Sequence, residues 1–288
     1  MKRTPQRRPL ITNGEGLVFV ELLVVLAVLA LLASTLLTVL ARSRSNSLAF
    51  RCLNNNRQLC SAWRMYADDN HDLMVYSSDD GRGTANPLNQ YAWTLLHMDF
   101  SPQNPALWDP ALDIYKRPLW PYTGRDPAIY KCPSDKSFIV VNGVAKPRVR
   151  SMSMNFYLGG FGGTDGGFSF IRNYRIFFKT TDLTTPGPAK TFVLLDQRPD
   201  SINWGNFLTD MTGYYPSQPT LYTLRDLPNM IHDGGCGFSF ADGRAELHRW
   251  TDPRTTPPVS HLFEPPGSYP SPRNPDIGWL QEHATRPK

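Results

Sequence analysis

The stretch that decides the fold is residues 17–41, LVFVELLVVLAVLALLASTLLTVLA, in which 21 of 25 residues are apolar and Glu21 is the single charge. Within it, residues 22–40 form an uncharged run of 19. As an α-helix rising about 1.5 Å per residue, this run nearly spans a hydrocarbon core of about 30 Å. It is longer than the apolar part of a cleavable signal peptide, which is about 7–15 residues. Composition alone therefore predicts one membrane-spanning helix, and a plain signal anchor is the simplest interpretation.

The rest of the chain has the composition of a water-soluble domain. The 288 residues are 41% apolar and 19% charged, with 21 Gly and 26 Pro. These values are typical of a loop-rich protein with enough apolar side chains to form a core. Most of the net charge of +5 comes from residues 1–16, which hold four basic residues and one acidic residue. Since the remainder is nearly neutral, no nucleic-acid partner is expected.

The helix is predicted to continue beyond the membrane. No Gly or Pro lies between Gly16 and Gly81, so nothing in this interval breaks a helix. Residues 42–70 carry an apolar stripe at helical spacing. The stripe consists of Leu48, Cys52, Leu59, Trp63 and Tyr66. Asp68-Asp69-Asn70 predicts the end of this amphipathic stalk.

The start of the apolar stretch carries a recognisable signal. Residues 16–25, GLVFVELLVV, resemble the cleavage and methylation signal of type IV prepilins, whose usual form is G-F-T-L-I-E-L-L-V-V. Residues 17–20, LVFV, differ from the usual F-T-L-I, while Gly16 and residues 21–25 match. The resemblance implies a leader of residues 1–16, cleavage after Gly16 by a prepilin peptidase, and N-methylation of Leu17. It also implies that the N-terminus faces the cytoplasm.

Glu21 has a physical reason to be important. A carboxylate inside a membrane helix is costly and by default marks function. The resemblance implies that Glu21 pairs with the freed amino group of a neighbouring subunit during assembly. The alternative is a glutamate near the helix end that extends to the membrane interface.

Further motifs resemble one large bacterial group of prepilin-like proteins, usually described as type II secretion or pseudopilin-like, with an H-x9-D-G motif. Residues 52–58, CLNNNRQ, and residues 66–70, YADDN, match its stalk signature. His232 followed by Asp242-Gly243 matches H-x9-D-G. Other family-like pieces are CPSD at 132–135, RSMSMN at 150–155 and FVLLD at 192–196.

The globular part is predicted to be rich in short β-strands. Strand-like runs occur at 138–141, 168–178, 191–195, 236–241 and 244–250. Asp242-Gly243 predicts a two-residue hairpin turn, because both residues tolerate positive φ. The glycine-rich residues 159–167 predict a flexible surface loop. Residues 251–288 hold nine prolines, which predicts an extended or disordered tail.

The H-x9-D-G region has a structural and a metal-binding interpretation. In the first, Asp242-Gly243 forms the turn and His232 holds the hairpin in place. In the second, metal ligands come from this region, with Asp233 and Asp242 contributing to a Ca²⁺ site. The candidate ligands for another metal are His232, Cys236 and His248. Their spacing matches no familiar zinc pattern. No cofactor is expected; calcium, which related pseudopilins carry in this region, is the metal to test first.

The cysteines and the search for catalytic motifs complete the prediction. Cys52 and Cys60 are eight residues apart on one helix, too far to pair with each other. The resemblance, with both residues in family-like motifs, favours a disulfide between Cys52 and Cys132 in an exported protein. No nucleophile elbow, metalloprotease motif, phosphate-binding loop or dinucleotide fingerprint occurs, so the chain is predicted not to be an enzyme.

Together these features predict an α+β fold: a long N-terminal transmembrane and stalk helix packed on a small antiparallel β-sheet domain, pilin-like and loop-rich. The predicted parts are a leader (1–16), membrane helix (17–41), stalk (42–70), extracytoplasmic domain (71–250) and Pro-rich tail (251–288). The resemblance implies a pseudopilin, single-pass in the bacterial inner membrane, with its C-terminal domain periplasmic or in a fibre. Its partners would be prepilin peptidase, other pilin-like subunits and the secretion or pilus machinery. The alternatives are a membrane-anchored binding module for polysaccharide and a tethered hydrolase.

Overall fold

The computed structural model describes residues 15–259 and 267–288, without the side chains of residues 15–18, 38–42 and 44. Most of the predicted leader, residues 1–14, lies outside the described residues. The chain divides into two compact units, with the boundary between Ser47 and Leu48.

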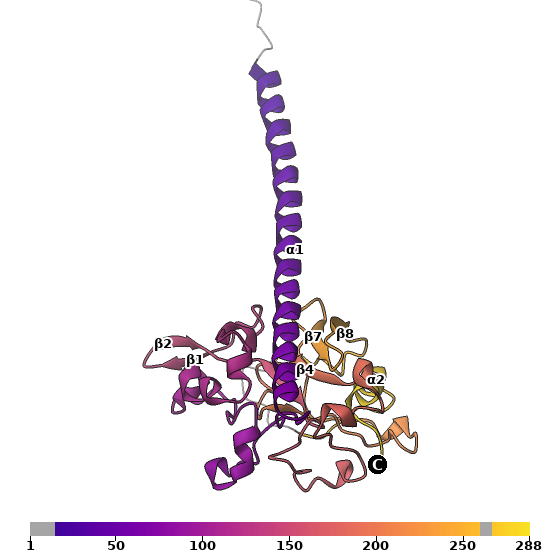
Figure 1. Ribbon diagram of the computed structural model, residues 1–288. Helices are drawn as coiled ribbons and strands as arrows, with labels where there is room; N and C mark the ends of the chain where they lie inside the picture. The colour runs from indigo at the N-terminus through magenta and orange to yellow at the C-terminus, as the bar shows by residue number, and fades with distance from the viewer. Residues whose placement is uncertain (1–14, 260–266) are drawn as a thin grey trace, which may run out of the picture. The chain divides into compact units, whose positions relative to one another are not determined.

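Helix α1 (Glu15–Asp69), the long indigo helix of Figure 1, crosses this boundary. Within it, Phe19–Leu37 is a 19-residue stretch of mean hydropathy 2.6 with exposed side chains. By length and composition this stretch is able to cross a membrane, a property that anchors and signal sequences share.

The part of α1 from Leu48 onward belongs to the C-terminal unit and confirms the predicted stripe at Cys52, Leu59, Trp63 and Tyr66, while Leu48 is half-buried. Its buried residues are Cys52, Asn56, Leu59, Cys60, Ala62, Trp63, Tyr66 and Ala67. The helix ends at Asp69, as the acidic cluster predicts. His71 and Asp72 then adopt positive φ, 56° and 66°, which turns the chain away from the helix.

The C-terminal unit is built on a five-stranded sheet of order β5-β3-β4-β7-β8. Its strands are β3 (Met152–Asn155), β4 (Phe192–Asp196), β5 (Asn206–Phe207), β7 (Gly235–Phe240) and β8 (Ala245–Arg249). Neighbours are antiparallel except β3 and β5, which are parallel. The α+β class is therefore confirmed, but the sheet is mixed and not wholly antiparallel.

Both faces of the central strands are covered. Every residue of β3, β4 and β7 is buried, the pattern of strands with packed layers on both sides. One apolar cluster joins α1 to the sheet through Cys52, Leu59 and Trp63 with Met152 and Met154. A second contains Phe192, Phe238 and Phe240 together with Ile277 and Leu280.

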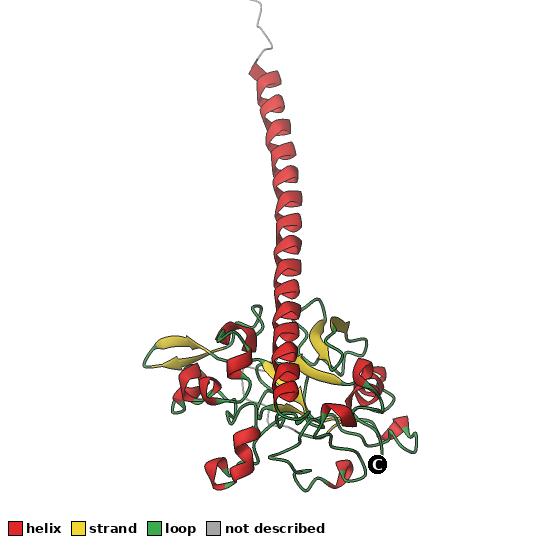
Figure 2. Cartoon of the chain, in the orientation of Figure 1, coloured by secondary structure: helices red, strands yellow, loops and turns green. Residues whose placement is uncertain are grey.

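Short elements complete the unit, and Figure 2 shows how much of it is loop. Strands β1 (Phe138–Val141) and β2 (Val144–Pro147) form a hairpin, and β6 (Thr223–Leu224) pairs with β9 (Tyr269–Pro270). The predicted strand at 168–178 is wrong, since this segment forms a 3-10 turn at Ser169–Ile171 and isolated bridges.

Two loop predictions are also corrected. In the glycine-rich residues 159–167 only the first part packs closely: residues 159–162 are buried, and a Cβ on Gly159 would lie 2.6 Å from Cα of Tyr76, whereas Thr164, Gly166 and Gly167 are exposed as predicted. The tail contains helix α2 (Pro275–Ala284). Asn274 caps its N-terminus by accepting a hydrogen bond from the Asp276 N–H, and Pro275 occupies the first turn, where proline is tolerated.

The β7–β8 hairpin forms as predicted, but its turn is longer. The Phe240 N–H donates to Arg244 O, which closes a three-residue loop. Gly243 has φ of +93°, whereas Asp242 is not in the left-handed region. The turn is thus the type I turn followed by a left-handed glycine, and not the two-residue turn.

Candidate metal centre

Four buried side chains from distant parts of the sequence meet in the C-terminal unit: Cys52, Cys132, Asp196 and His232. One potential ligand atom from each lies within 4.8 Å of the others. The Cys132 Sγ to His232 Nε2 distance is 3.1 Å. Cys52, Cys132 and Asp196 are 0% exposed and His232 is 3% exposed. Each residue falls in one of the sequence motifs singled out above, at 52–58, 132–135, 192–196 and 232–243.

Different elements deliver the two cysteines. Cys52 lies on the buried face of α1, where Asn56 Nδ2 contacts its sulfur at 3.9 Å. Cys132 follows the 3-10 turn Pro127–Tyr130. Asn55 fixes the chain before Cys132, since its Nδ2 donates to the Ala128 and Lys131 carbonyls at 3.2 and 3.0 Å. The asparagines after Cys52 therefore hold both sulfur atoms in position.

Asp196 ends the central strand β4 and is held by neutral donors. Its Oδ1 accepts from Ser151 Oγ at 2.7 Å, and its Oδ2 accepts from Asn229 Nδ2 at 3.0 Å. The same Ser151 hydroxyl accepts from the Cys132 N–H at 2.8 Å. These bonds fix the orientation of the carboxylate but bring no positive charge to it.

His232 lies in the turn before β7. The His232 backbone N–H donates to Gly235 O at 3.2 Å, and the Gly235 N–H donates to the His232 carbonyl at 3.2 Å. Its side chain points to the sulfur of Cys132 and not to the hairpin tip. His232 thus contacts the hairpin, as the prediction has it, through backbone hydrogen bonds to Gly235 and not through its side chain.

The electrostatics of the cluster favour one thiolate. Hydrogen bonds from the Cys52 thiol and from His232 lower the pKa of Cys132. The same hydrogen bond, together with burial, raises the pKa of Cys52. Burial raises the pKa of Asp196, and the negative charge at Cys132 raises it further.

The arrangement suits metal binding better than nucleophilic catalysis. A thiolate beside an imidazole is also the nucleophile and base of cysteine hydrolases. Here, however, Cys132 is 0% exposed, so a substrate does not reach it in this conformation. Two sulfurs, one imidazole nitrogen and one carboxylate oxygen form the type of donor set that binds zinc.

The predicted Cys52–Cys132 pair is close enough to interact, but the structure has all four cysteines as free thiols. The disulfide stays a prediction. Cys60 is not in this cluster; its thiol donates to Phe240 O at 3.1 Å.

Of the other predicted ligands, Cys236 of β7 is buried near the cluster, where burial and the negative charges of Asp196 and Cys132 raise its pKa, but it is not one of the four grouped residues. Asp233, Asp242 and His248 do not join His232. Asp242 follows the far end of β7, and Arg64 of α1 donates to its carbonyl at 3.0 Å. Asp233 forms an ion pair with Arg249. His248 stacks on Trp279, with 3.7 Å between ring centroids. Calcium binding at Asp233 and Asp242 stays a prediction.

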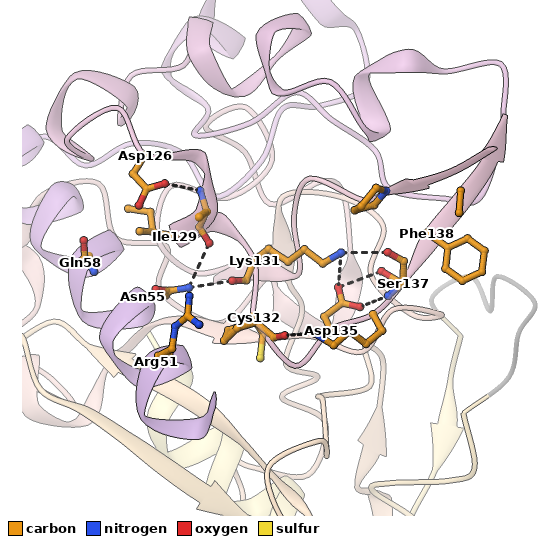
Figure 3. A pocket seen from close by; sticks show the side chains of 15 residues that line it. Arg51, Asn55, Gln58, Asp126, Ile129, Lys131, Cys132, Asp135, Ser137 and Phe138 are labelled. Carbon is orange, nitrogen blue, oxygen red and sulfur yellow. Dashed lines mark hydrogen bonds and ion pairs between the residues drawn. The ribbon is translucent and has the colours of Figure 1, made fainter. Parts of the chain in front are cut away.

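A cavity of about 590 Å³ lies beside the cluster (Figure 3), and Cys132 is part of its wall although the residue itself is 0% exposed. Lys131 Nζ donates to Ser137 O at 3.1 Å and lies 3.6 Å from Asp135 Oδ2. Burial lowers the pKa of Lys131. Arg51 and Lys136 add cationic groups and Asp126 adds a second carboxylate, so three cations face two acids and the cavity has the chemistry to receive a polar or anionic ligand.

The predicted processing residues lie in the other unit. Gly16 and Leu17 belong to the first turn of α1, and their side chains are outside the described set. Glu21 lies in the same helix with an exposed side chain.

Comparison with protein-family models, with curated proteins and with solved structures found no significant match.

Sequence reasoning missed Asp196 as a member of the cluster. The sequence did carry a signal for Asp196. An acidic residue directly after an apolar run such as FVLL is more often buried or functional than an acidic residue in a polar segment. What the sequence did not contain is the pairing of β4 with β3 and β7, which brings this residue beside Cys132 and His232.

Proposed function

We propose that this protein is a pilin-like structural subunit of the bacterial cell envelope. It is inserted in the inner membrane, cut after Gly16 by a prepilin peptidase, and N-methylated at Leu17. It then assembles through α1 into a type II secretion or type IV pilus-like fibre. The protein does not act as an enzyme in this role.

The observation that carries the proposal is the continuity of α1. One helix of 55 residues contains the prepilin-like signal, the apolar stretch and the buried stalk stripe. Side chains between Phe19 and Leu37 are exposed, and apolar side chains of this kind require lipid or the same helix of other subunits. Glu21 is the only charge within that stretch, and pairing with another subunit's amino group offsets its cost in lipid.

Processing is tested by the mass of the N-terminus. The full chain is expressed with and without a prepilin peptidase, and the intact protein is measured by mass spectrometry. We expect a mature chain that begins at Leu17 only when the peptidase is present, and an uncut chain for Gly16→Ala. An identical processed mass for Gly16→Ala and the parent would contradict the proposal.

Assembly is tested separately from processing. Glu21→Ala should be cut normally but should lose formaldehyde-crosslinked multimers in the membrane. Val20→Ala is the matched control, since Val20 is also exposed in α1, and it should retain them. Equal multimer yields from both variants would remove Glu21 from assembly.

The cavity of Figure 3 favours a second candidate function, a membrane-anchored binding module. A polysaccharide with acidic groups fits the cations at its edge. A glycan array probed with the purified full chain, and with Arg51→Ala and Lys136→Ala, distinguishes the two. Binding that depends on these side chains supports the binding module. If no glycan binds, this second function is rejected and the assembly function is retained.

A further inference from the structure

We propose that Cys52, Cys132, Asp196 and His232 together bind one Zn²⁺ ion as a structural centre of the C-terminal unit. This proposal does not rest on the function proposed above, since all four residues lie in the unit Leu48–Lys288.

The first support is the spacing of the ligand atoms. With Zn–S of about 2.3 Å and Zn–N or Zn–O of about 2.1 Å, tetrahedral coordination places ligand atoms roughly 3.4–3.8 Å apart. The four ligand atoms lie within 4.8 Å of one another, and Cys132 Sγ is 3.1 Å from His232 Nε2. Small side-chain shifts therefore bring all four to bonding distance around one ion.

The second support is charge. A buried carboxylate is costly without a cation, and the hydrogen-bond donors to Asp196 are the neutral side chains of Ser151 and Asn229. A divalent ion bound between this carboxylate and the two sulfurs offsets the cost of burying them.

The third support is the identity of the donors. Sulfur ligands select zinc over calcium and magnesium, which take oxygen ligands, six to eight of them in the case of calcium. Four protein ligands close a tetrahedral site completely, as in structural zinc sites, whereas catalytic sites keep one position open.

The fourth support is the set of residues that orient the ligands. Ser151 and Asn229 hold Asp196, and Asn56 contacts the sulfur of Cys52. Outer hydrogen bonds of this kind are a regular feature of metal sites. The ion would join α1, the segment after the turn Pro127–Tyr130, strand β4 and the turn before β7. It would thereby fix the stalk part of α1 to the sheet.

The experiment measures zinc in the full chain purified in detergent without chelator. We expect about one zinc per chain by elemental mass spectrometry, as for a closed structural site. After exchange for Co²⁺, thiolate-to-cobalt charge-transfer bands and strong visible bands of tetrahedral cobalt should appear. Cys132→Ser and His232→Ala should each lower zinc affinity at least about tenfold.

Cys60→Ser is the matched control, because Cys60 is also a buried cysteine of α1 but lies outside the cluster. It should keep both the zinc and the cobalt spectrum. Where a ligand variant does not fold, the cobalt spectrum of the parent chain decides. Folded parent protein that binds neither zinc nor cobalt overturns the proposal, as does an unreduced mass that shows a Cys52–Cys132 disulfide in the folded chain.

Discussion

The Sγ atom of Cys132 lies 3.1 Å from Nε2 of His232, although 100 residues separate them in the sequence. This contact joins the motif after the turn Pro127–Tyr130 to the first residue of the H-x9-D-G motif. The histidine of that motif is therefore directed into the interior, toward α1 and β4, while the Asp-Gly pair forms the hairpin tip.

His232→Ala is expected to destabilise the C-terminal unit. The substitution removes a buried ring and its contact with Cys132, which should lower the free energy of unfolding by about 2–4 kcal/mol. Urea denaturation of the full chain in detergent, followed by tryptophan fluorescence, measures it. His71→Asn is the control, because His71 is exposed with φ of 56°, which asparagine tolerates. Equal midpoints for the two variants would show that the buried histidine is not needed for packing.

Asn229→Ala tests the residues that orient the metal ligands. Loss of its 3.0 Å hydrogen bond to Asp196 should weaken zinc binding by about 10–100-fold while leaving all four ligands present. A competition titration with a chromogenic zinc chelator gives the affinity. Asn54→Ala, an exposed change on α1, should leave the affinity unchanged. Unaltered affinity in Asn229→Ala would mean that the carboxylate needs no outer support.

Periodicity and breakers were sufficient to predict the elements whose structure is local. The end of α1 at Asp69, the stalk stripe and strands β1, β4, β7 and β8 follow from residue spacing and from turn residues. Helix α2 was missed because the proline count of the tail outweighed a local start signal. Asn274-Pro275-Asp276 combines a capping asparagine, a first-turn proline and a first-turn acid.

The metal cluster was not predictable in the same way. Cys52, Cys132 and His232 were each singled out by motif, but their meeting depends on strand order in the sheet, which no local pattern encodes. Gly237 shows the difficulty. In the sequence it is a residue that weakens a strand, whereas in the structure it leaves the space in which α1 places Cys52 and Asn56.

Gly237→Ala should therefore loosen the contact between α1 and the sheet. A Cβ at Gly237 would lie 3.0 Å from Asn56 Nδ2, so the Asn56 side chain on α1 must give by a few tenths of an ångström, and 3.6 Å from Cys52 Sγ, an ordinary contact. We expect a loss of about 1–3 kcal/mol in unfolding free energy, measured by urea denaturation.

Gly278→Ala, within helix α2, is the matched control. A Cβ at Gly278 would meet Tyr222 at 3.6 Å, an ordinary contact. That change should stabilise by up to about 1 kcal/mol. Stabilisation by both would contradict the close packing at β7.

Leu280→Ala tests whether α2 is part of the core. Leu280 is 1% exposed in the cluster that contains Phe238 and Phe240, so truncation should cost about 2–5 kcal/mol. Thermal unfolding followed by circular dichroism measures the change. Glu282→Ala, on the exposed side of α2, should cost less than about 1 kcal/mol. If Leu280→Ala left the melting temperature unchanged, α2 would not be part of the core.

Asp226 should make stability depend on pH. Burial raises its pKa to about 7, whereas a carboxyl in the unfolded chain has a pKa of about 3.9. Between these two values the folded state holds a proton that the unfolded state has lost. The contribution of Asp226 to the free energy of unfolding should therefore fall as pH rises through this window, by about 1.4 kcal/mol per unit at most, and level off above pH 7. Asp226→Asn stays neutral and its side-chain oxygen can still accept the Leu208 N–H, which Asp226 Oδ2 accepts at 2.6 Å. The variant should therefore show a flatter profile of unfolding free energy against pH and exceed the parent in stability at pH 8.

Urea denaturation at pH 5, 6, 7 and 8 gives the slopes of the Asp226→Asn variant and the parent, with the exposed Asp68→Asn as the control that keeps the parent slope. Parallel slopes for Asp226→Asn and the parent would show that Asp226 is ionised in the folded protein throughout this range.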